Sequence, residues 1–210
     1  MVKAIIFDLQ GTLVENGVYP SPTRQVKNIL RIDMPFSDFV MRFEKVMMVS
    51  NHKSLSEAFE KVCEEFGVQP KHFIIEKLVA MWNQNKLFSK IFNDTIPTLT
   101  ELKKKKYHLI LSSNMDPFSK DLVDRFKFKD YFDEIILSCD TGLVKNDEGF
   151  YDKVLEKYDA SDILLVGDSL ESDIATAKGL GMNSVLVDRH NKREYEPKIV
   201  TLEDLDRYLN

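Results

Sequence analysis

Two different patterns of hydrophobic and polar positions alternate with each other along the chain. Short, apolar and partly β-branched runs, without alternating polar positions, are typical of parallel strands that are covered on both faces. Such runs predict strands at 2–7, 107–113, 134–138, 162–168 and 183–188. Amphipathic stretches that are long enough for crossover helices lie between them, at 96–105, 120–126, 150–158 and 173–180. This succession of strand and helix predicts an α/β fold with a doubly wound parallel sheet.

The segment from about residue 19 to 88 has the second pattern, with almost no strand-like run and several helical periods bounded by caps and prolines. The predicted helices are 22–30, 37–49, 54–66 and 70–85. Ser54 is followed three residues later by Glu57, which is the spacing of a capping box at the start of a helix. We therefore expect an all-helical cap domain, inserted after the first strand.

The change of pattern sets the expected domain boundaries. The core would consist of residues 1–16 and 89–210, and the cap of residues 17–88. The two connections, near 15–18 and 87–93, are where we expect the chain to bend if the cap closes over a site. Gly17 offers a permissive backbone position in the first of them.

The net charge, the apolar runs and the cysteines of the chain limit the functions and cellular locations that we expect. The 210 residues carry a net charge of −5, which argues against a general nucleic-acid binder. The first apolar run is too short for a secretory segment or a membrane span. Cys63 and Cys139 lie far apart without a CxxC spacing, which indicates buried structural thiols in a reducing compartment. We expect a cytoplasmic protein that binds neither nucleic acid nor membrane.

Polar residues follow the predicted strands where each strand ends. In open α/β sheets, ligands bind at the carboxyl ends of the strands. Each residue alone has an ordinary explanation, since an aspartate often caps a helix and a loop lysine is usually solvated. Together they would supply a nucleophile, a hydroxyl donor, a cation and carboxylates for a hard divalent metal, a combination that suits phosphoryl transfer. The residues are Asp8, Ser113, Lys145, Asp168 and Asp173.

The segments FDLQGTL, LSSN, LVKND and GDSLESD, in this order, resemble the four motifs of the haloacid dehalogenase superfamily. The helical insertion is similar to the cap of the phosphoglycolate-phosphatase-like and β-phosphoglucomutase-like branches. The resemblance spans nearly the whole chain. It implies a Rossmann-like core with a helical cap, and a Mg²⁺-dependent phosphatase that acts on a small phosphorylated metabolite.

The resemblance also implies a role for each motif residue. Asp8 would be the nucleophile that forms an aspartyl-phosphate, and the backbone carbonyl of Gln10 would join the Asp8 carboxylate as a Mg²⁺ ligand. Asp168 would be a further metal ligand, with Asp173 close by or acting through water.

The phosphate side of the implied site comes from two other segments. Ser113 and the amide at Asn114 would hold the transferring phosphoryl oxygens, and Lys145 would neutralise their charge and that of Asp8. Asn114 has an equally weighted explanation as a turn residue that closes the strand.

Gln10 departs from the family pattern, because family phosphatases and mutases usually carry a second aspartate at this position. That aspartate protonates the leaving oxygen and then activates the water that cleaves the acyl phosphate. A primary amide has no proton-transfer equilibrium near neutral pH, although it donates and accepts hydrogen bonds. Position 10 therefore lacks acid–base chemistry while it retains its backbone ligand.

Three functions are compatible with this departure. The first in rank is a Mg²⁺-dependent phosphatase of reduced efficiency, acting on small phosphate esters or acyl phosphates. A non-catalytic module that binds a phosphorylated ligand or a protein partner ranks second. A metal-independent 2-haloacid dehalogenase ranks last, because Asp168 and Asp173 are both retained and halide release does not need a metal cage. Polar cap residues, among them Arg42 and His52, are candidates for substrate contacts, although exposure at helix ends explains them more simply.

Overall fold

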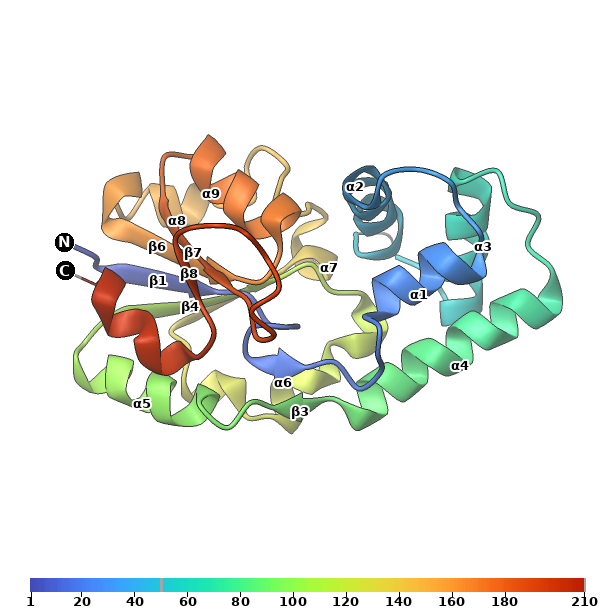
Figure 1. Ribbon diagram of the computed structural model, residues 1–210. Coiled ribbons are helices and arrows are strands. Elements are labelled where there is room, and N and C mark those ends of the chain that lie inside the picture. Colours follow the sequence, from blue (N-terminus) through green and yellow to red (C-terminus); the bar gives the residue numbers. More distant parts are fainter. Residues whose placement is uncertain (50, 210) are drawn as a thin grey trace.

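The fold of the core is a six-stranded parallel sheet (Figure 1), seen in a computed structural model that describes residues 1–49 and 51–209. The strand order is β5-β4-β1-β6-β7-β8. The strands are β1 (Ala4–Phe7), β4 (His108–Ser113), β5 (Glu134–Leu137), β6 (Ile163–Gly167), β7 (Asn183–Val187) and β8 (Lys198–Ile199). All five predicted strands are confirmed. The sixth, β8, spans only two residues and has no hydrophobic run by which it could be predicted.

The central strand β1 is buried on both faces, as its uninterrupted apolar sequence predicts. Ile5 and Phe7 belong to a hydrophobic cluster shared with α5 (Thr95–Lys104) and α6 (Asp121–Arg125) on one face. Ala4 and Ile6 belong to a second cluster, shared with α8 (Asp152–Leu155) and α9 (Ala175–Gly179) on the other face. Helices therefore cover both faces, which is the doubly wound arrangement that the sequence predicts (Figure 1).

Two predicted helices of the core are shorter than expected. The stretch 150–158 is α-helical only in α8, and the stretch 173–180 only in α9. A π-helical turn, η4 (Leu170–Ile174), precedes α9, and Ser169 caps it by accepting a hydrogen bond from the Ser172 N–H. The remaining short helices of the core are α7 (Ser138–Thr141), η1 (Pro117–Ser119), η2 (Phe128–Asp130), η3 (Ala160–Asp162) and η5 (Leu202–Tyr208).

Four helices form a separate unit beyond the carboxyl ends of the strands (Figure 1). They are α1 (Pro22–Ile29), α2 (Phe36–Met47), α3 (Leu55–Glu65) and α4 (His72–Phe88). Their apolar faces share their own hydrophobic core, with an aromatic cluster in which Phe43 and Phe59 both contact Trp82. The four predicted cap helices are thus confirmed, with ends that differ by up to three residues.

The predicted capping box at the start of α3 is half confirmed. Ser54 Oγ accepts a hydrogen bond from the Glu57 N–H at 3.2 Å, as expected. Glu57 Oε2, however, accepts from the N–H of Lys53 at 2.6 Å, one residue before the capping serine. Both side chains still satisfy backbone donors at the helix start, where no intrahelical acceptor exists.

The two connections between core and cap pair with each other. Strand β2 (Val14–Glu15) lies antiparallel to β3 (Lys90–Ile91). The N–H of Gly17 then donates to Asn85 Oδ1 at 2.9 Å. A Cβ at position 17 would lie 2.2 Å from the backbone oxygen of Asn85. Glycine is therefore required here by close approach to α4 rather than by an unusual backbone angle.

Other expectations from composition have a mixed outcome. Cys63 is buried in the cap, as predicted, but Cys139 is only half-buried in α7, and neither forms a disulfide. Within residues 1–49 and 51–209, no helix has the length and apolar character needed to cross a bilayer.

Candidate active site

The carboxylate of Asp8 lies at the end of the central strand and is paired with a buried lysine. Lys145 Nζ donates to Asp8 Oδ1 at 2.6 Å and to Asp173 Oδ1 at 2.7 Å. The Lys145 side chain is only 2% exposed, although the residue lies in a turn between α7 and α8. The lysine is thus held between two carboxylates that come from different strand ends, as the predicted convergence requires.

Asp168, at the end of β6, completes a cluster of three carboxylates. One oxygen each of Asp8, Asp168 and Asp173 lies within 4.8 Å of the others. Gly11 borders this cluster with a φ of +87°, and a Cβ there would lie 2.4 Å from Asp168 Oδ2. Glycine at this position therefore meets two needs, a left-handed backbone and a close approach to the Asp168 carboxylate.

The cluster has more negative than positive charge. Burial raises the pKa of Asp8 to about 6, although Lys145 acts in the opposite direction. Burial also raises the pKa of Asp168 well above its ordinary value, and repulsion from Asp8 and Asp173 adds to this. Burial alone would lower the pKa of Lys145, but Asp173 and Asp8 outweigh it and keep that pKa raised. Among the described residues, the buried Lys145 ammonium and the nearby Arg193 guanidinium therefore face three carboxylates.

This excess charge fits a divalent cation. Asp8 Oδ2 is buried and has no hydrogen-bond partner among the described residues. Oxygen donors of this kind are the ligands that hard cations such as Mg²⁺ prefer. Asp173 differs from the other two, since both of its oxygens accept hydrogen bonds, Oδ1 from Lys145 and Oδ2 from the N–H of Ser169 at 3.0 Å. Asp173 is thus a member of the carboxylate cluster that also orients Lys145.

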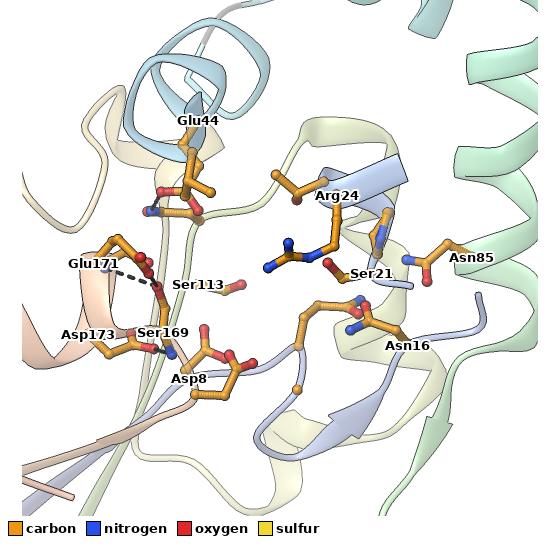
Figure 2. A pocket seen from close by; sticks show the side chains of 18 of the residues that line it. Asp8, Asn16, Ser21, Arg24, Glu44, Asn85, Ser113, Ser169, Glu171 and Asp173 are labelled. Carbon is orange, nitrogen blue, oxygen red and sulfur yellow. Dashed lines mark hydrogen bonds between the residues drawn. The ribbon is translucent and has the colours of Figure 1, made fainter. Parts of the chain in front are cut away.

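The predicted phosphate-binding residues, Ser113 and Asn114, lie at the carboxyl end of β4 and line the same cavity as the three carboxylates. Ser113 is labelled in Figure 2, where its side chain lies between the carboxylates and the cap. The side chain of Asn114 links three segments: its Nδ2 donates to Glu44 Oε2 of the cap at 2.7 Å, and its Oδ1 accepts from the Lys145 N–H at 2.9 Å. Asn114 therefore fixes the backbone that carries Lys145.

Gln10 lines the same cavity as Asp8. Its side-chain Oε1 is buried and accepts no hydrogen bond within residues 1–49 and 51–209. Whether its backbone carbonyl holds a metal stays a prediction.

A cavity of about 420 Å³ separates this cluster from the cap. From the cap, it is lined by Arg24, Phe36, Glu44, Trp82 and Asn85, among other residues. Figure 2 shows Arg24 directed toward the cavity, and its guanidinium carbon lies 4.1 Å from the centre of the Phe36 ring.

The cap residues that the sequence offered as substrate contacts lie elsewhere. Arg42 is exposed and pairs with Glu65 at 2.8 Å, and the His52 ring bonds to the Val46 carbonyl at 2.9 Å. Neither lines the cavity. Glu44 does line the cavity, but the sequence pattern did not indicate it as a candidate. It lies four residues after the buried Val40, so a charged position beside the apolar stripe of α2 was the available signal.

Comparison with known proteins decides the family. The model of a haloacid dehalogenase-like hydrolase matches residues 2–181. The chain belongs to this family. As the resemblance in its motifs implies, it is a hydrolase of the phosphatase type. Among curated relatives, it is 26% identical over 194 residues to the glyceraldehyde 3-phosphate phosphatase of Pyrococcus abyssi (strain GE5 / Orsay), covering 88% of this chain and 81% of that protein.

Solved structures show the same fold over the whole chain. A HAD phosphatase from Thermococcus onnurineus superposes with a TM-score of 0.64 at 24% identity, covering 100% of this chain and 98% of the other. The HAD-hydrolase YfnB from Bacillus subtilis, bound to magnesium, has a TM-score of 0.64 at 16% identity, covering 100% and 99%. The α/β core and the helical cap of this chain therefore have the same overall fold as these two structures.

Proposed function

We propose that this HAD-family hydrolase is a Mg²⁺-dependent phosphatase that acts on a small phosphorylated metabolite through an aspartyl-phosphate on Asp8. The observation that carries the proposal is the position of Asp8, which is bonded to Lys145 through Oδ1 and has no hydrogen-bond partner on Oδ2 among the described residues. A carboxylate that is oriented and charge-compensated in this way is suited to attack phosphorus.

The side chains of this chain account for the first step. The Asp8 carboxylate attacks the phosphoryl group, the bond from phosphorus to the leaving oxygen breaks, and Lys145 offsets negative charge beside the transferred group. Ser113 is placed to donate a hydrogen bond to a phosphoryl oxygen. Water then attacks phosphorus, which releases phosphate and restores Asp8. Catalysis of this kind depends mostly on positioning and charge neutralisation.

The residues that would hold Mg²⁺ are Asp8, Asp168 and the backbone carbonyl of Gln10. The bound ion would supply charge neutralisation at the phosphoryl oxygens. We assign Asp173 a different duty, because both of its oxygens already accept hydrogen bonds, one of them from Lys145. It would orient the lysine and reach the ion through water.

Activity should be attenuated, because Gln10 stands where the family usually has an acid–base aspartate. Its amide cannot take a proton from the water that attacks the aspartyl-phosphate. The cavity of about 420 Å³ suits a small metabolite. Because the curated relatives are named glyceraldehyde 3-phosphate phosphatases, this triose phosphate is the first substrate to test.

The test measures phosphate release from glyceraldehyde 3-phosphate and a panel of phosphorylated metabolites, with Mg²⁺ and with excess EDTA. We expect activity only with Mg²⁺, and none in the Asp8→Asn variant. Asp38→Asn, the same chemical change on the exposed surface of the cap, serves as the control and should retain full activity.

Undiminished turnover in excess EDTA would contradict the proposal that activity depends on Mg²⁺. Chloride release from 2-chloropropionate under that condition would instead identify a dehalogenase. Full activity of Asp8→Asn would show that Asp8 is not the nucleophile.

A further inference from the structure

Glu44 brings a carboxyl group from the cap to the cavity that contains Asp8 (Figure 2). The bond from Asn114 Nδ2 to Glu44 Oε2, at 2.7 Å, fixes one carboxyl oxygen against the core. The other oxygen, Oε1, takes part in no hydrogen bond within residues 1–49 and 51–209. The cap therefore presents a carboxyl group at the cavity, with one oxygen held by Asn114 and the other without a hydrogen bond among the described residues.

The charged groups around Glu44 do not favour its ionised form enough to offset burial. Burial raises the pKa of Glu44 to about 8, and Asp173 and Asp8 add to the increase. The bond from Asn114 and the charge of Lys145 act in the opposite direction.

The other charged neighbours are on α1, on η4 and at the end of α2. Arg24 of α1 lines the same cavity as Glu44. Glu171 of η4 lines the same cavity, and the adjacent Lys45 is paired with Asp147 at 2.8 Å. A pKa of about 8 favours the protonated form of Glu44 at neutral pH.

We propose that Glu44 is a catalytic residue that protonates the leaving oxygen of the substrate, the task that Gln10 cannot perform. This inference rests on the proposed phosphatase function and deepens it. As the bond from Asp8 to phosphorus forms, the bond from phosphorus to the leaving oxygen breaks, and its electron pair takes the proton of Glu44 Oε1. The alcohol departs, and the Glu44 carboxylate regains a proton from water.

The other carboxyl groups that line the cavity are less suited to this role. Glu171 accepts a hydrogen bond from Ser169 Oγ at 3.3 Å, and Asp188 accepts one from the Arg193 N–H at 2.6 Å. Asp116 accepts hydrogen bonds from Trp82, from Ser119 and from the Phe118 N–H. Asp8, Asp168 and Asp173 form the candidate metal cluster. Glu15 lies on β2 at the connection to the cap and is exposed. Glu44 combines a carboxyl group held by Asn114, a position on the cap side of the cavity and a raised pKa.

The test uses Glu44→Gln, which preserves an acceptor for the Asn114 amide and removes only the proton. The substrates are phenyl phosphate and p-nitrophenyl phosphate, which have similar shapes but differ in how much their leaving oxygen needs a proton. The measured quantity is kcat/KM, which reports the steps up to departure of the leaving group. Loss of a positioned acid typically costs ~10²–10⁴-fold. We expect a loss of about 10²-fold on phenyl phosphate and of less than about 3-fold on p-nitrophenyl phosphate.

The pH profile provides a second readout that a structural role would not change. For phenyl phosphate, kcat/KM of the native protein should fall as pH rises through about 8, because the acid form of Glu44 is lost. This fall should be absent in Glu44→Gln. Glu15→Gln is the same change at another carboxyl group that lines the cavity. It should change neither the ratio of kcat/KM between the two substrates nor the pH profile.

The inference would be overturned by equal losses on both substrates, or by no loss on either. Its failure can be told apart from failure of the proposed phosphatase function, because hydrolysis of p-nitrophenyl phosphate that depends on Asp8 would persist. In a Gln10→Asp background, the aspartate should take over the proton transfer, so that Glu44→Gln costs less than about 3-fold on phenyl phosphate. If Glu44→Gln still lowers kcat/KM on phenyl phosphate by about 10²-fold in the Gln10→Asp background, the role of Glu44 as the acid is also contradicted.

Discussion

At the scale of single residues, Gln10 separates binding chemistry from proton transfer. Its backbone carbonyl stays available as a ligand whatever the side chain is, but its amide neither gives nor takes a proton near neutral pH. The buried Oε1 has no hydrogen-bond partner among the described residues, so the native fold does not depend on a bond to this atom. A carboxylate could stand at this position without the loss of such a contact.

We therefore expect Gln10→Asp to raise steady-state turnover. Positioned acid–base catalysis is worth ~10²–10⁴-fold, and an increase of at least about 10-fold is expected on alkyl phosphates. In the native protein, the aspartyl-phosphate should accumulate and give a burst with p-nitrophenyl phosphate or acetyl phosphate, followed by a slow steady state. Rapid-quench measurement of the burst and of the steady rate checks both statements. Unchanged turnover on alkyl phosphates would show that position 10 is not the acid–base position.

At the scale of elements, the connection from the first strand to the cap is constrained by backbone contact. Gly17 follows β2 and its N–H donates to the side chain of Asn85 in α4. The oxygen that a Cβ would meet at 2.2 Å belongs to the backbone, so it cannot move away as a flexible side chain can. The close approach of these two segments therefore requires that position 17 carry no side chain.

Gly17→Ala should destabilise the protein by about 1–3 kcal/mol, the usual cost of overpacking a tight contact. Gly179→Ala is the matched control, because a Cβ at that exposed position in α9 meets nothing within 4 Å. The control should be neutral or stabilising by up to ~1 kcal/mol, since alanine favours the helix. Urea unfolding of the three proteins measures the difference. Equal stability of the two variants would contradict the close contact.

At the scale of the whole molecule, polar contacts fasten the cap to the core. Trp82 Nε1 donates to Asp116 Oδ2 at 3.0 Å, and Ser138 Oγ donates to the Met48 carbonyl at 2.9 Å. Together with the bond from Asn114 to Glu44, these contacts join residues of the cap and of the core at the cavity. Because these contacts lie at the border of the cavity, movement of the cap would widen access to it, and we propose that residues 17–88 swing as a unit about the paired strands β2 and β3.

Solution scattering tests this motion. We expect the radius of gyration to decrease when Mg²⁺ and beryllofluoride, a mimic of the aspartyl-phosphate, are added to the native protein. Asp8→Asn is the control, since it lacks the carboxylate that holds the mimic, and its scattering should not change. No change for the native protein would count against a mobile cap.

Local patterns were sufficient to predict much of this architecture. The five longer strands and the four cap helices follow from uninterrupted apolar runs and from helical periods, because burial on two faces or on one face leaves these patterns in the sequence. The convergence of Asp8, Lys145 and Asp173 could also be predicted, because the carboxyl ends of parallel strands meet at one edge. The π-helical turn η4 and the two-residue strand β8 have no such pattern.

The tertiary structure alone decided how the cap meets the core. No local pattern indicates that Asn114 bonds to Glu44, which lies 70 residues away, or that Arg42 and His52 turn away from the cavity. The angle at which a helical unit docks depends on the packing of many side chains from distant segments, so a single position does not reveal which residue will face the site. The chemistry of the strand ends was therefore predictable from the sequence. The cap residues that would select and protonate a substrate were not.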